Sequence, residues 1–430
     1  MPGLSVAPYA TGSLESLKHE DEQMASEQES ALKGRRVLEL ADEKGVYCGK
    51  LLADMGADVI KIERPGGDAT RRIPPFWQDE AHAEKSLFFM YMNTSKRGVT
   101  LDITKPEGRN IFKQLAQTAD IILETFPPGY LDDLGLGYET LKASNRRLVL
   151  TSITGFGQTG PYKHFEAADI VAAALGGAMY VTGEEEDPPV NLAGSQSYVM
   201  ASTVAAASSM IALYRSSLSG EGQHIDISVE ETTASVTHIC GVGKWLDDNI
   251  IPRRSGTALF SSVPSGAYRC KDGMVYLMIN RPLHWKALAK WIHEVTGNEE
   301  VLSPIFEGPS SNRQEYRELL DIYTSDLCSQ FTVDEIYHEG QRRHIAFTPV
   351  KSATAVAQDA HLAARNYFIE VAHPGAGTLK YPGAPYRHSE TPWNITRLAP
   401  AIGQHNEQVY TTELRIPEED LRSLETDGVI

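Results

Sequence analysis

The stretch GRRVLELADEKGVYCGKLLADMGADVIKIERPGG, residues 34–67, decides the fold of this chain. Its apolar run Val37–Leu40 predicts a buried strand, and GKLLADMGA, residues 49–57, has the spacing of a helix. DVIKIE then predicts a second strand, which ends at Pro65 and the glycines after it. A strand, a helix and a strand in this order predict a right-handed crossover and a parallel sheet.

The same alternation continues downstream. Helical spacing recurs in RNIFKQLAQTA (109–119) and YETLKASN (138–145), and strand-like runs recur in DIILETF (120–126) and RLVLTSITGFG (147–157). Two stretches rich in small residues, 169–178 and 198–215, predict a closely packed pair of helices. The sequence therefore predicts an α/β large domain with a Rossmann-like parallel sheet over residues 34–235.

The texture changes from about Pro252. SGAYRCKDGMVYLMI, residues 265–279, alternates around a Lys-Asp-Gly turn and predicts a β-hairpin, with helical patterning after it. We therefore predict a smaller α+β domain over 252–348. The turn-rich segment 349–430 is predicted to return to the large domain. Residues 1–33 form a polar stretch that is predicted to be a disordered tail.

Composition limits the classes of partner. The formal net charge of -17 argues against nucleic acid or an anionic membrane as the main partner. No apolar run approaches the roughly 18 residues of a membrane span. The same charge means that any polyanionic ligand needs a local basic patch.

The four cysteines are far apart, with no CxxC pair and no histidine cluster at zinc spacing. We therefore expect reduced thiols, no metal site and a cytoplasmic protein. The N-terminal stretch lacks the basic and apolar regions of a secretory signal.

Taken without any family, the motifs carry little chemistry. GFGQTGPY, residues 155–162, is a glycine-rich loop after a predicted strand, but it matches neither a Walker loop nor GxGxxG. No nucleophile elbow is present.

Several segments together resemble one family, the class III CoA-transferases. These segments are GADVIKIERPGGDATR, NTSKRGVTLDITKPEGR, ADIILETFPPGYLDDLGLGYETL, SITGFGQTGPY and SGEGQHIDISVEETTAS. The resemblance is strong over residues 34–234 and continues weakly through the predicted hairpin. It implies ring-shaped chains that interlock as dimers, with a CoA thioester as substrate and no tightly bound cofactor.

The resemblance also implies a chemistry. In this family an aspartate attacks the acyl-CoA thioester, passes through a mixed anhydride and an aspartyl thioester, and is released by the acceptor acid. The reaction requires a carboxylate nucleophile, oxyanion donors, exclusion of water and cations for the CoA phosphates.

The match of this chain to that pattern is incomplete. Along TGEEEDPPVNLAGSQSY, Tyr198 falls on the nucleophilic aspartate, and Asp169 falls on a supporting acid. Asp133 and Glu166 replace basic residues that contact CoA. The pocket element AGP reads KGV at Lys44–Val46.

Four residues match the family at its CoA site: Arg64, Lys96, Arg97 and Leu101. The two charge reversals nevertheless predict a disabled CoA site, because each changes the local charge by about two units beside a polyanion. A tyrosine, with an ordinary pKa of about 10, is protonated at neutral pH and is a poor nucleophile here.

Plainer readings stay open for each position. Tyr198 reads as a core residue, Asp169 as a helix cap, and Lys96 with Arg97 as a solvated turn. The acidic run Glu184–Glu186 reads as a solvated loop or hides a replacement nucleophile.

Three functional hypotheses follow. The first is a non-catalytic subunit of a heteromeric transferase, such as succinyl-CoA:benzylsuccinate CoA-transferase, with a paralogous partner that carries the aspartate. The second is a self-sufficient transferase or acyl-CoA isomerase that uses another acid. The third is a scaffold or regulator without enzymatic activity. The first is preferred because persistence of the whole fold fits a subunit.

Overall fold

The computed structural model describes residues 29–237, 241–259, 261–374 and 376–430. Most of the predicted tail, residues 1–28, lies outside the described part. The chain divides into two compact units, each assembled from separate segments. Unit 1 comprises the chain up to Gly176, then Ala193–Val236 and Ile369–Ile430, and unit 2 comprises Gly177–Leu192 and Thr237–Phe368. The linear domain boundaries given above stay a prediction.

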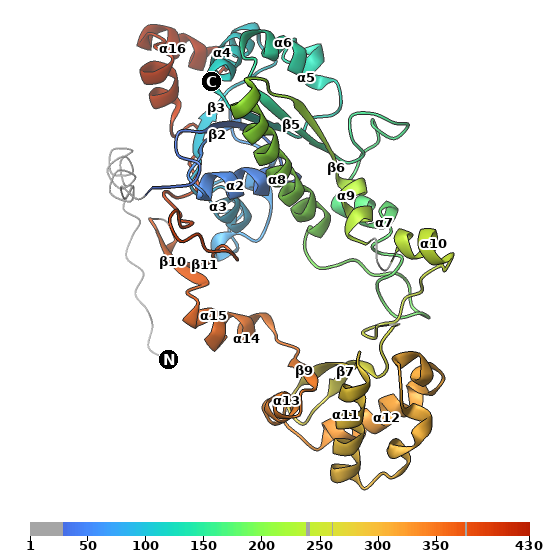
Figure 1. The fold of residues 1–430 in the computed structure, drawn as a ribbon. Helices are drawn as coiled ribbons and strands as arrows, with labels where there is room; N and C mark the ends of the chain where they lie inside the picture. The colour runs from blue at the N-terminus through green and yellow to red at the C-terminus, as the bar shows by residue number, and fades with distance from the viewer. Residues whose placement is uncertain (1–28, 238–240, 260, 375) are drawn as a thin grey trace, which may run out of the picture. The chain divides into compact units, whose positions relative to one another are not determined.

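Unit 1 is built on a six-stranded parallel sheet in the order β3-β2-β1-β4-β5-β6 (Figure 1). Its strands are β1 (Arg36–Leu40), β2 (Asp58–Glu63), β3 (Arg97–Thr100), β4 (Ile121–Glu124), β5 (Val149–Thr154) and β6 (His224–Ser228). The predicted α/β class and the predicted parallel sheet are confirmed. The sequence analysis did not predict β3 and β6, which are the two short edge strands.

Helices cover both faces of this sheet. Those of unit 1 are α2 (Val46–Asp54), α3 (Leu87–Met92), α4 (Pro106–Thr118), α5 (Tyr130–Asp133), α6 (Tyr138–Ser144), α7 (Asp169–Leu175), α8 (Gln196–Ser219), α9 (Val229–Val236) and α16 (Glu418–Thr426). Consecutive strand residues point to opposite faces, so Leu38 belongs to one apolar core and Val37 to another.

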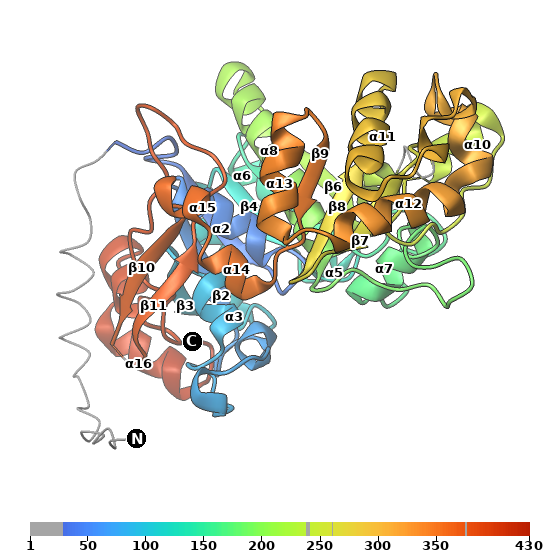
Figure 2. The same ribbon diagram turned by 90° about the horizontal axis from the view of Figure 1, so that it is seen from below.

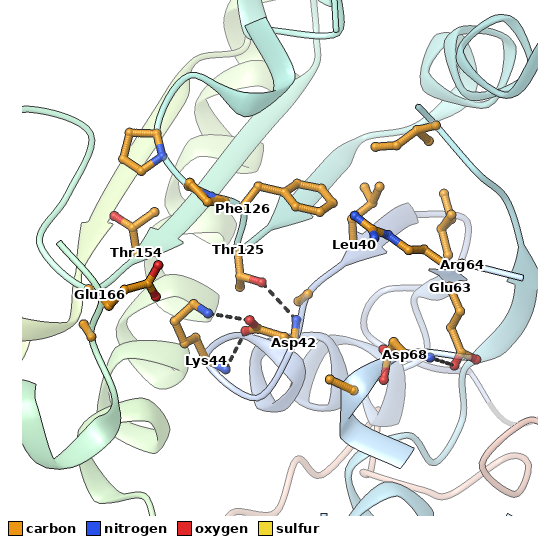
Figure 3. A pocket seen from close by; sticks show the side chains of 18 of the residues that line it. Leu40, Asp42, Lys44, Glu63, Arg64, Asp68, Thr125, Phe126, Thr154 and Glu166 are labelled. Carbon is orange, nitrogen blue, oxygen red and sulfur yellow. Dashed lines mark hydrogen bonds and ion pairs between the residues drawn. The ribbon is translucent and has the colours of Figure 1, made fainter. Parts of the chain in front are cut away.

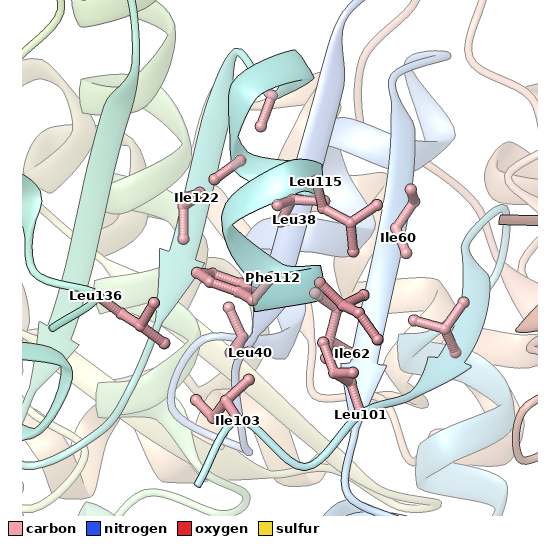
Figure 4. Close-up of a cluster of buried hydrophobic side chains, with 14 of the residues drawn as sticks. Leu38, Leu40, Ile60, Ile62, Leu101, Ile103, Phe112, Leu115, Ile122 and Leu136 are labelled. Atoms are coloured by element: carbon pink, nitrogen blue, oxygen red, sulfur yellow. The ribbon is translucent and has the colours of Figure 1, made fainter. Parts of the chain in front are cut away.

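Helix α4 closes the first of these cores. Figure 4 shows Phe112 and Leu115 of α4 lying over Leu38, Ile60 and Ile122 from three neighbouring strands. All five side chains are fully buried. The second core lies under α2 and α8, where small alanines let the two helices approach closely.

A buried cluster of charges joins β1, β2 and the segment before β3. The Glu39 carboxylate lies 3.3 Å from Lys61 Nζ and 2.7 Å from Lys96 Nζ, and all three side chains are fully buried. Burial would lower the pKa of Lys61, but Asp68 and Glu39 overcome it and raise that pKa. For Lys96, burial prevails over Glu39 and lowers the pKa to about 8. A side chain at Gly49 would collide with the Glu39 carboxylate.

Helix α8 needs a separate comment. By length and composition it is, among the described helices, the one that could cross a membrane. The sequence analysis predicted a helix here but no membrane span, because serines and threonines interrupt the apolar run. Half of its most apolar window is buried, as in the core helix of a soluble fold, so it gives no evidence of a membrane.

Unit 2 contains an antiparallel sheet of β7 (Ser265–Arg269), β8 (Met274–Met278) and β9 (Ala346–Pro349), in that order. The predicted hairpin is confirmed as β7 and β8. The helices of unit 2 are α10 (Val242–Asp248), α11 (Pro282–Thr296), α12 (Arg317–Ser329), α13 (Val333–Arg342), α14 (Ala353–Ala357) and α15 (Ala360–Ala364). Figure 2 shows α13 beside β9. The core is aromatic, with Trp291 packed edge-on against Phe347.

The last segment of the chain packs on unit 1. It contains the strand pair β10 (Phe368–His373) and β11 (Gly377–Pro382) and then runs beside β3. Tyr410 donates its hydroxyl to the Thr100 carbonyl at 2.8 Å, and Arg97 pairs with Glu413. The edge strand β3 is therefore secured by residues more than three hundred positions later in the chain.

The buried charge cluster yields a stability prediction. Glu39→Gln leaves Lys61 and Lys96 without their shared carboxylate, so we expect the free energy of unfolding to fall by about 3–5 kcal/mol. Urea unfolding followed by circular dichroism measures the change. The matched control is Glu221→Gln, whose partner Arg146 is largely exposed, and we expect it to cost less than about 1 kcal/mol. Equal losses in the two variants would contradict a structural role for the cluster.

Candidate functional site

A cavity of about 540 Å³ in unit 1 lies at the carboxyl ends of β1, β2, β4 and β5. We call it the Arg64 cavity, and its walls are the segments that follow these four strands (Figure 3). The sheet order runs outward in both directions from β1 and β4. Ligands of open α/β sheets bind at such a switch point, in the crevice beyond the strand ends.

Most carboxylates that line this cavity already form a salt bridge with a lysine or arginine. The Glu63 carboxylate receives two hydrogen bonds from Arg71, each of 2.7 Å. Asp68 lies 2.7 Å from Lys61 Nζ. Asp42 pairs with Lys44, and its backbone N–H donates to Thr125 Oγ1 at 2.9 Å. These acids therefore contribute little net negative charge.

Three cations in the cavity form no salt bridge with a carboxylate in the described part of the chain. They are Arg64, Arg72 and Lys163. Arg64 interacts with Asp102 only at longer range. Glu166 is the corresponding unpaired acid, and Figure 3 shows it near Lys44, on the opposite side from Arg64. The cavity thus has an excess of positive charge in a protein of net charge -17. This is the local basic patch that a polyanionic ligand requires.

Apolar side chains complete the walls. Leu101, 2% exposed, lines the cavity, and its backbone N–H donates to the Glu63 carbonyl at 2.7 Å. Phe126 and Phe165 line it as well. A mostly apolar pocket with a few convergent cations suits an organic anion, such as a phosphorylated cofactor or substrate.

Two predicted CoA contacts are used elsewhere in the fold. Lys96 donates to the Val46 carbonyl and to Asn93 Oδ1, both at 3.0 Å, in addition to its pairing with Glu39. Arg97 pairs with Asp58 and Glu413. Both side chains are buried, neither lines the Arg64 cavity, and neither lies in a solvated turn. Their predicted role in binding CoA stays a prediction that this geometry does not favour.

The two charge reversals have different positions. Glu166 lines the cavity, whereas Asp133, at the end of α5, is exposed and does not line it. One reversed charge therefore faces the cavity that Arg64, Arg72 and Lys163 also line. The prediction that the CoA site is disabled stays untested.

Tyr198 lies in the first turn of α8 and is 4% exposed. Its hydroxyl donates to the Ala167 carbonyl at 3.0 Å. Burial raises the pKa of Tyr198, and the nearby carboxylates of Glu43 and Asp42 raise it further. The phenol is therefore protonated and hydrogen-bonded, as in a core tyrosine.

Asp169 caps the N-terminus of α8. It is the first residue of α7, and its Oδ1 accepts the backbone N–H of Tyr198 at 3.0 Å. A carboxylate at a helix N-terminus satisfies an otherwise free N–H and interacts favourably with the helix dipole. Asp169 therefore holds the first turn of α8 at Tyr198.

The acidic run Glu184–Glu186 belongs to unit 2. There Glu185 pairs with Arg253 in an exposed salt bridge. In the described ranges, no group of three or more His, Cys, Asp or Glu side chains is arranged to hold a metal ion.

The sequence analysis placed Lys44 in the pocket, but it missed Arg72 and Lys163 as cavity residues. Their positions in the sequence were the only available signal. Arg72 follows the KIERPGGD segment, and Lys163 follows the glycine-rich loop, whose Gly155 lines the cavity. A lysine next to such a loop is not distinguishable from a solvated one without the fold.

Comparison with known proteins identifies the family. Residues 32–406 match the family described as CoA-transferase family III. The chain is 34% identical to succinyl-CoA:(R)-benzylsuccinate CoA-transferase subunit BbsE of Thauera aromatica, over 87% of this chain and 92% of the relative. It is 32% identical to succinyl-CoA–D-citramalate CoA-transferase of Chloroflexus aurantiacus, over 92% and 97%.

A solved structure agrees. A CaiB/BaiF family protein from Brucella suis superimposes with a TM-score of 0.77 at 28% identity, over 90% of this chain and all of that chain. The family match over most of the chain, the two relatives and this fold all point the same way: the chain belongs to CoA-transferase family III.

Proposed function

We propose that this chain is a non-catalytic subunit of a class III CoA-transferase, and that a paralogous partner carries the aspartate nucleophile. The complex moves CoA from an acyl-CoA, proposed to be succinyl-CoA, to a carboxylic acid of the benzylsuccinate type. The donor and acceptor are suggested by a relative whose name contains both. The proposed location is the cytoplasm, and the CoA thioester is a substrate of the complex.

The single observation that carries this proposal is the state of Tyr198. Transfer through a mixed anhydride needs a carboxylate that attacks the thioester carbonyl. At this position the chain has a buried phenol that donates to the Ala167 carbonyl and whose pKa is raised by burial. A protonated phenol held in this way does not attack a thioester or form an anhydride.

A partner is also suggested by the exposed side of α8. Val204, Ile211 and Leu218, spaced by seven residues, are 40%, 70% and 72% exposed, and Tyr214 lies on the same side. An apolar helix stripe of this kind is typical of a protein interface. A paralogous subunit is its proposed occupant, because a similar chain is named as a subunit. The interlocked dimer of the family is the proposed form of the complex.

The second candidate is a self-sufficient enzyme that uses another acid. Glu43 is the described residue that favours it, because it is exposed and lies near both Asp169 and Tyr198. Partial burial, together with Asp42, raises the pKa of Glu43. Trapping of an acyl group on the peptide that contains Glu43 would establish this candidate. A pure scaffold would show no transferase activity in any complex.

The composition of the native complex tests the first proposal. We expect native mass spectrometry to find this chain bound to a relative that carries an aspartate at the position matching Tyr198. The chain alone should show no transferase activity, and the pair should show it. An active homodimer would contradict the proposal.

Substitution of Tyr198 separates packing from chemistry. Tyr198→Phe removes one hydrogen bond, so we expect a loss of about 1–2 kcal/mol in unfolding free energy and an unchanged rate in the complex. Tyr198→Asp buries a carboxylate near Asp169 and Glu43, so we expect a loss of about 3 kcal/mol or more and no activity in the isolated chain. Inactivation of the complex by Tyr198→Phe, or transferase activity in Tyr198→Asp, would overturn this reading.

The two reversed charges can be tested against each other. Glu166→Lys places a cation in the Arg64 cavity, so we expect CoA to bind about tenfold more tightly. Asp133→Lys makes the same charge change outside the cavity and serves as the control, with a smaller effect because salt screens it. Isothermal titration calorimetry with CoA measures both. A larger effect at position 133 would mean that the CoA phosphates lie near α5.

A further inference from the structure

A second cavity of unit 1 has no role in the function proposed above. It has a volume of about 290 Å³ and is lined by residues from the end of β4, the middle of β5 and the start of β6, and from α5 and α6. We call it the Ser152 cavity. Pro127 lines both cavities, so the loop after β4 forms a shared wall.

Three neighbouring strands supply a hydrogen-bonded row to this cavity. Ser152 Oγ of β5 lies 2.9 Å from His224 Nε2 of β6. Ser152 also donates to the carboxylate of Glu124 at the end of β4. Glu124 Oε2 accepts the backbone N–H of Phe126 at 2.7 Å. The carboxyl group is 4% exposed and has no salt bridge with any Lys or Arg that the structure describes.

Two further polar atoms in the cavity lack a hydrogen bond. Tyr138 Oη and Gln158 Nε2 are buried, both residues line the cavity, and neither atom has a partner within the described part of the chain. Buried donors are rarely left unpaired, because an unmade hydrogen bond is costly. The pair therefore requires a bound molecule, either water or a ligand with an oxygen acceptor.

The charge of the lining favours a cation. Glu124, Asp132 and Glu139 line the cavity, and no Lys or Arg among the described residues does so. Burial lowers the pKa of His224, so this histidine is neutral at pH 7. Tyr130 and Tyr138 also line the cavity. The Tyr138 ring already has Lys142 Nζ 5.4 Å from its centroid, so Tyr138 offers a ligand its hydroxyl.

We propose that the Ser152 cavity is a second ligand site, built for a small organic cation that carries a hydrogen-bond-accepting oxygen, such as a protonated amino alcohol. The ammonium group binds the Glu124 carboxylate, and the oxygen accepts from Tyr138 Oη and Gln158 Nε2. The volume is at the lower end of the range of about 300–1,000 Å³ for ligand pockets, so the ligand is small. This proposal does not depend on the proposed transferase function.

The site has a built-in pH dependence. Burial raises the pKa of Glu124 to about 7, although Ser152 and the Phe126 N–H lower it. A cation prefers the ionised carboxylate, so binding tightens as pH rises through this value and weakens below it. The charged and titratable groups around Glu124 are Asp42, Lys44, Asp132, Tyr138, Glu139 and His224.

Equilibrium dialysis of radiolabelled ethanolamine against the full chain tests the proposal. We expect saturable binding at one site per chain, tighter at pH 8 than at pH 6, with ethylene glycol and acetate unable to compete. Glu124→Gln keeps the shape but cannot ionise, so it should weaken binding about tenfold or more and abolish the pH dependence. Arg64→Gln, in the other cavity, is the matched control and should change binding less than twofold.

Tyr138→Phe gives an independent readout. It removes an unpaired hydroxyl, so the ligand-free protein should be as stable as the wild type, while the rise in Tm produced by ethanolamine should shrink. Three results would overturn the proposal: no saturable binding, equal binding by wild type and Glu124→Gln, or a crystal structure grown with ethanolamine in which water alone bonds Tyr138 and Gln158.

Discussion

The structure of unit 1 depends on a carboxylate buried between two lysines. Glu39 of β1 holds Lys61 of β2 and Lys96 from the segment before β3, with no access to water. Taking three charges out of water is expensive, so such a cluster persists only when its geometry is satisfied. Lys61 in turn neutralises Asp68 at the wall of the Arg64 cavity. Lys61 therefore links the buried charge cluster to the cavity, where it neutralises the charge of Asp68.

At Tyr198, where the family resemblance places the nucleophile, the side chain is buried and hydrogen-bonded. Tyr198 lies in the first turn of α8, and the Asp169 carboxylate caps this helix. The Tyr198 hydroxyl donates to the Ala167 carbonyl, and the Asp169 carboxylate accepts the Tyr198 backbone N–H. A carboxylate in the place of Tyr198 would have to share this space with acids on two other segments, whereas the neutral phenol does not. The substitution is therefore coherent with its surroundings.

The sequence predicted the central part of the fold well and the charges poorly. Strands β1, β2, β4 and β5 are buried on both sides and were visible as mostly apolar runs, because both faces of the sheet are covered. Strand β3 was hidden, since Arg97 reads as a solvated charge until Asp58 and Glu413 are placed beside it. Arg72 and Lys163 were missed for the converse reason: a lysine or arginine without a partner looks the same in a sequence as one on the surface. Pairing over long separations is a property of the fold, and the segments alone do not reveal it.

The return of the C-terminal segment to β3 has a consequence for biosynthesis. Arg97 and Thr100 leave the ribosome early, but their partners Glu413 and Tyr410 are made roughly three hundred residues later. At about 5–20 residues per second this interval lasts roughly 15 to 60 s. During that time the sheet has an open edge and a buried arginine without its full set of partners. The edge of the sheet at β3 therefore gains these contacts only once Tyr410 and Glu413 have been made.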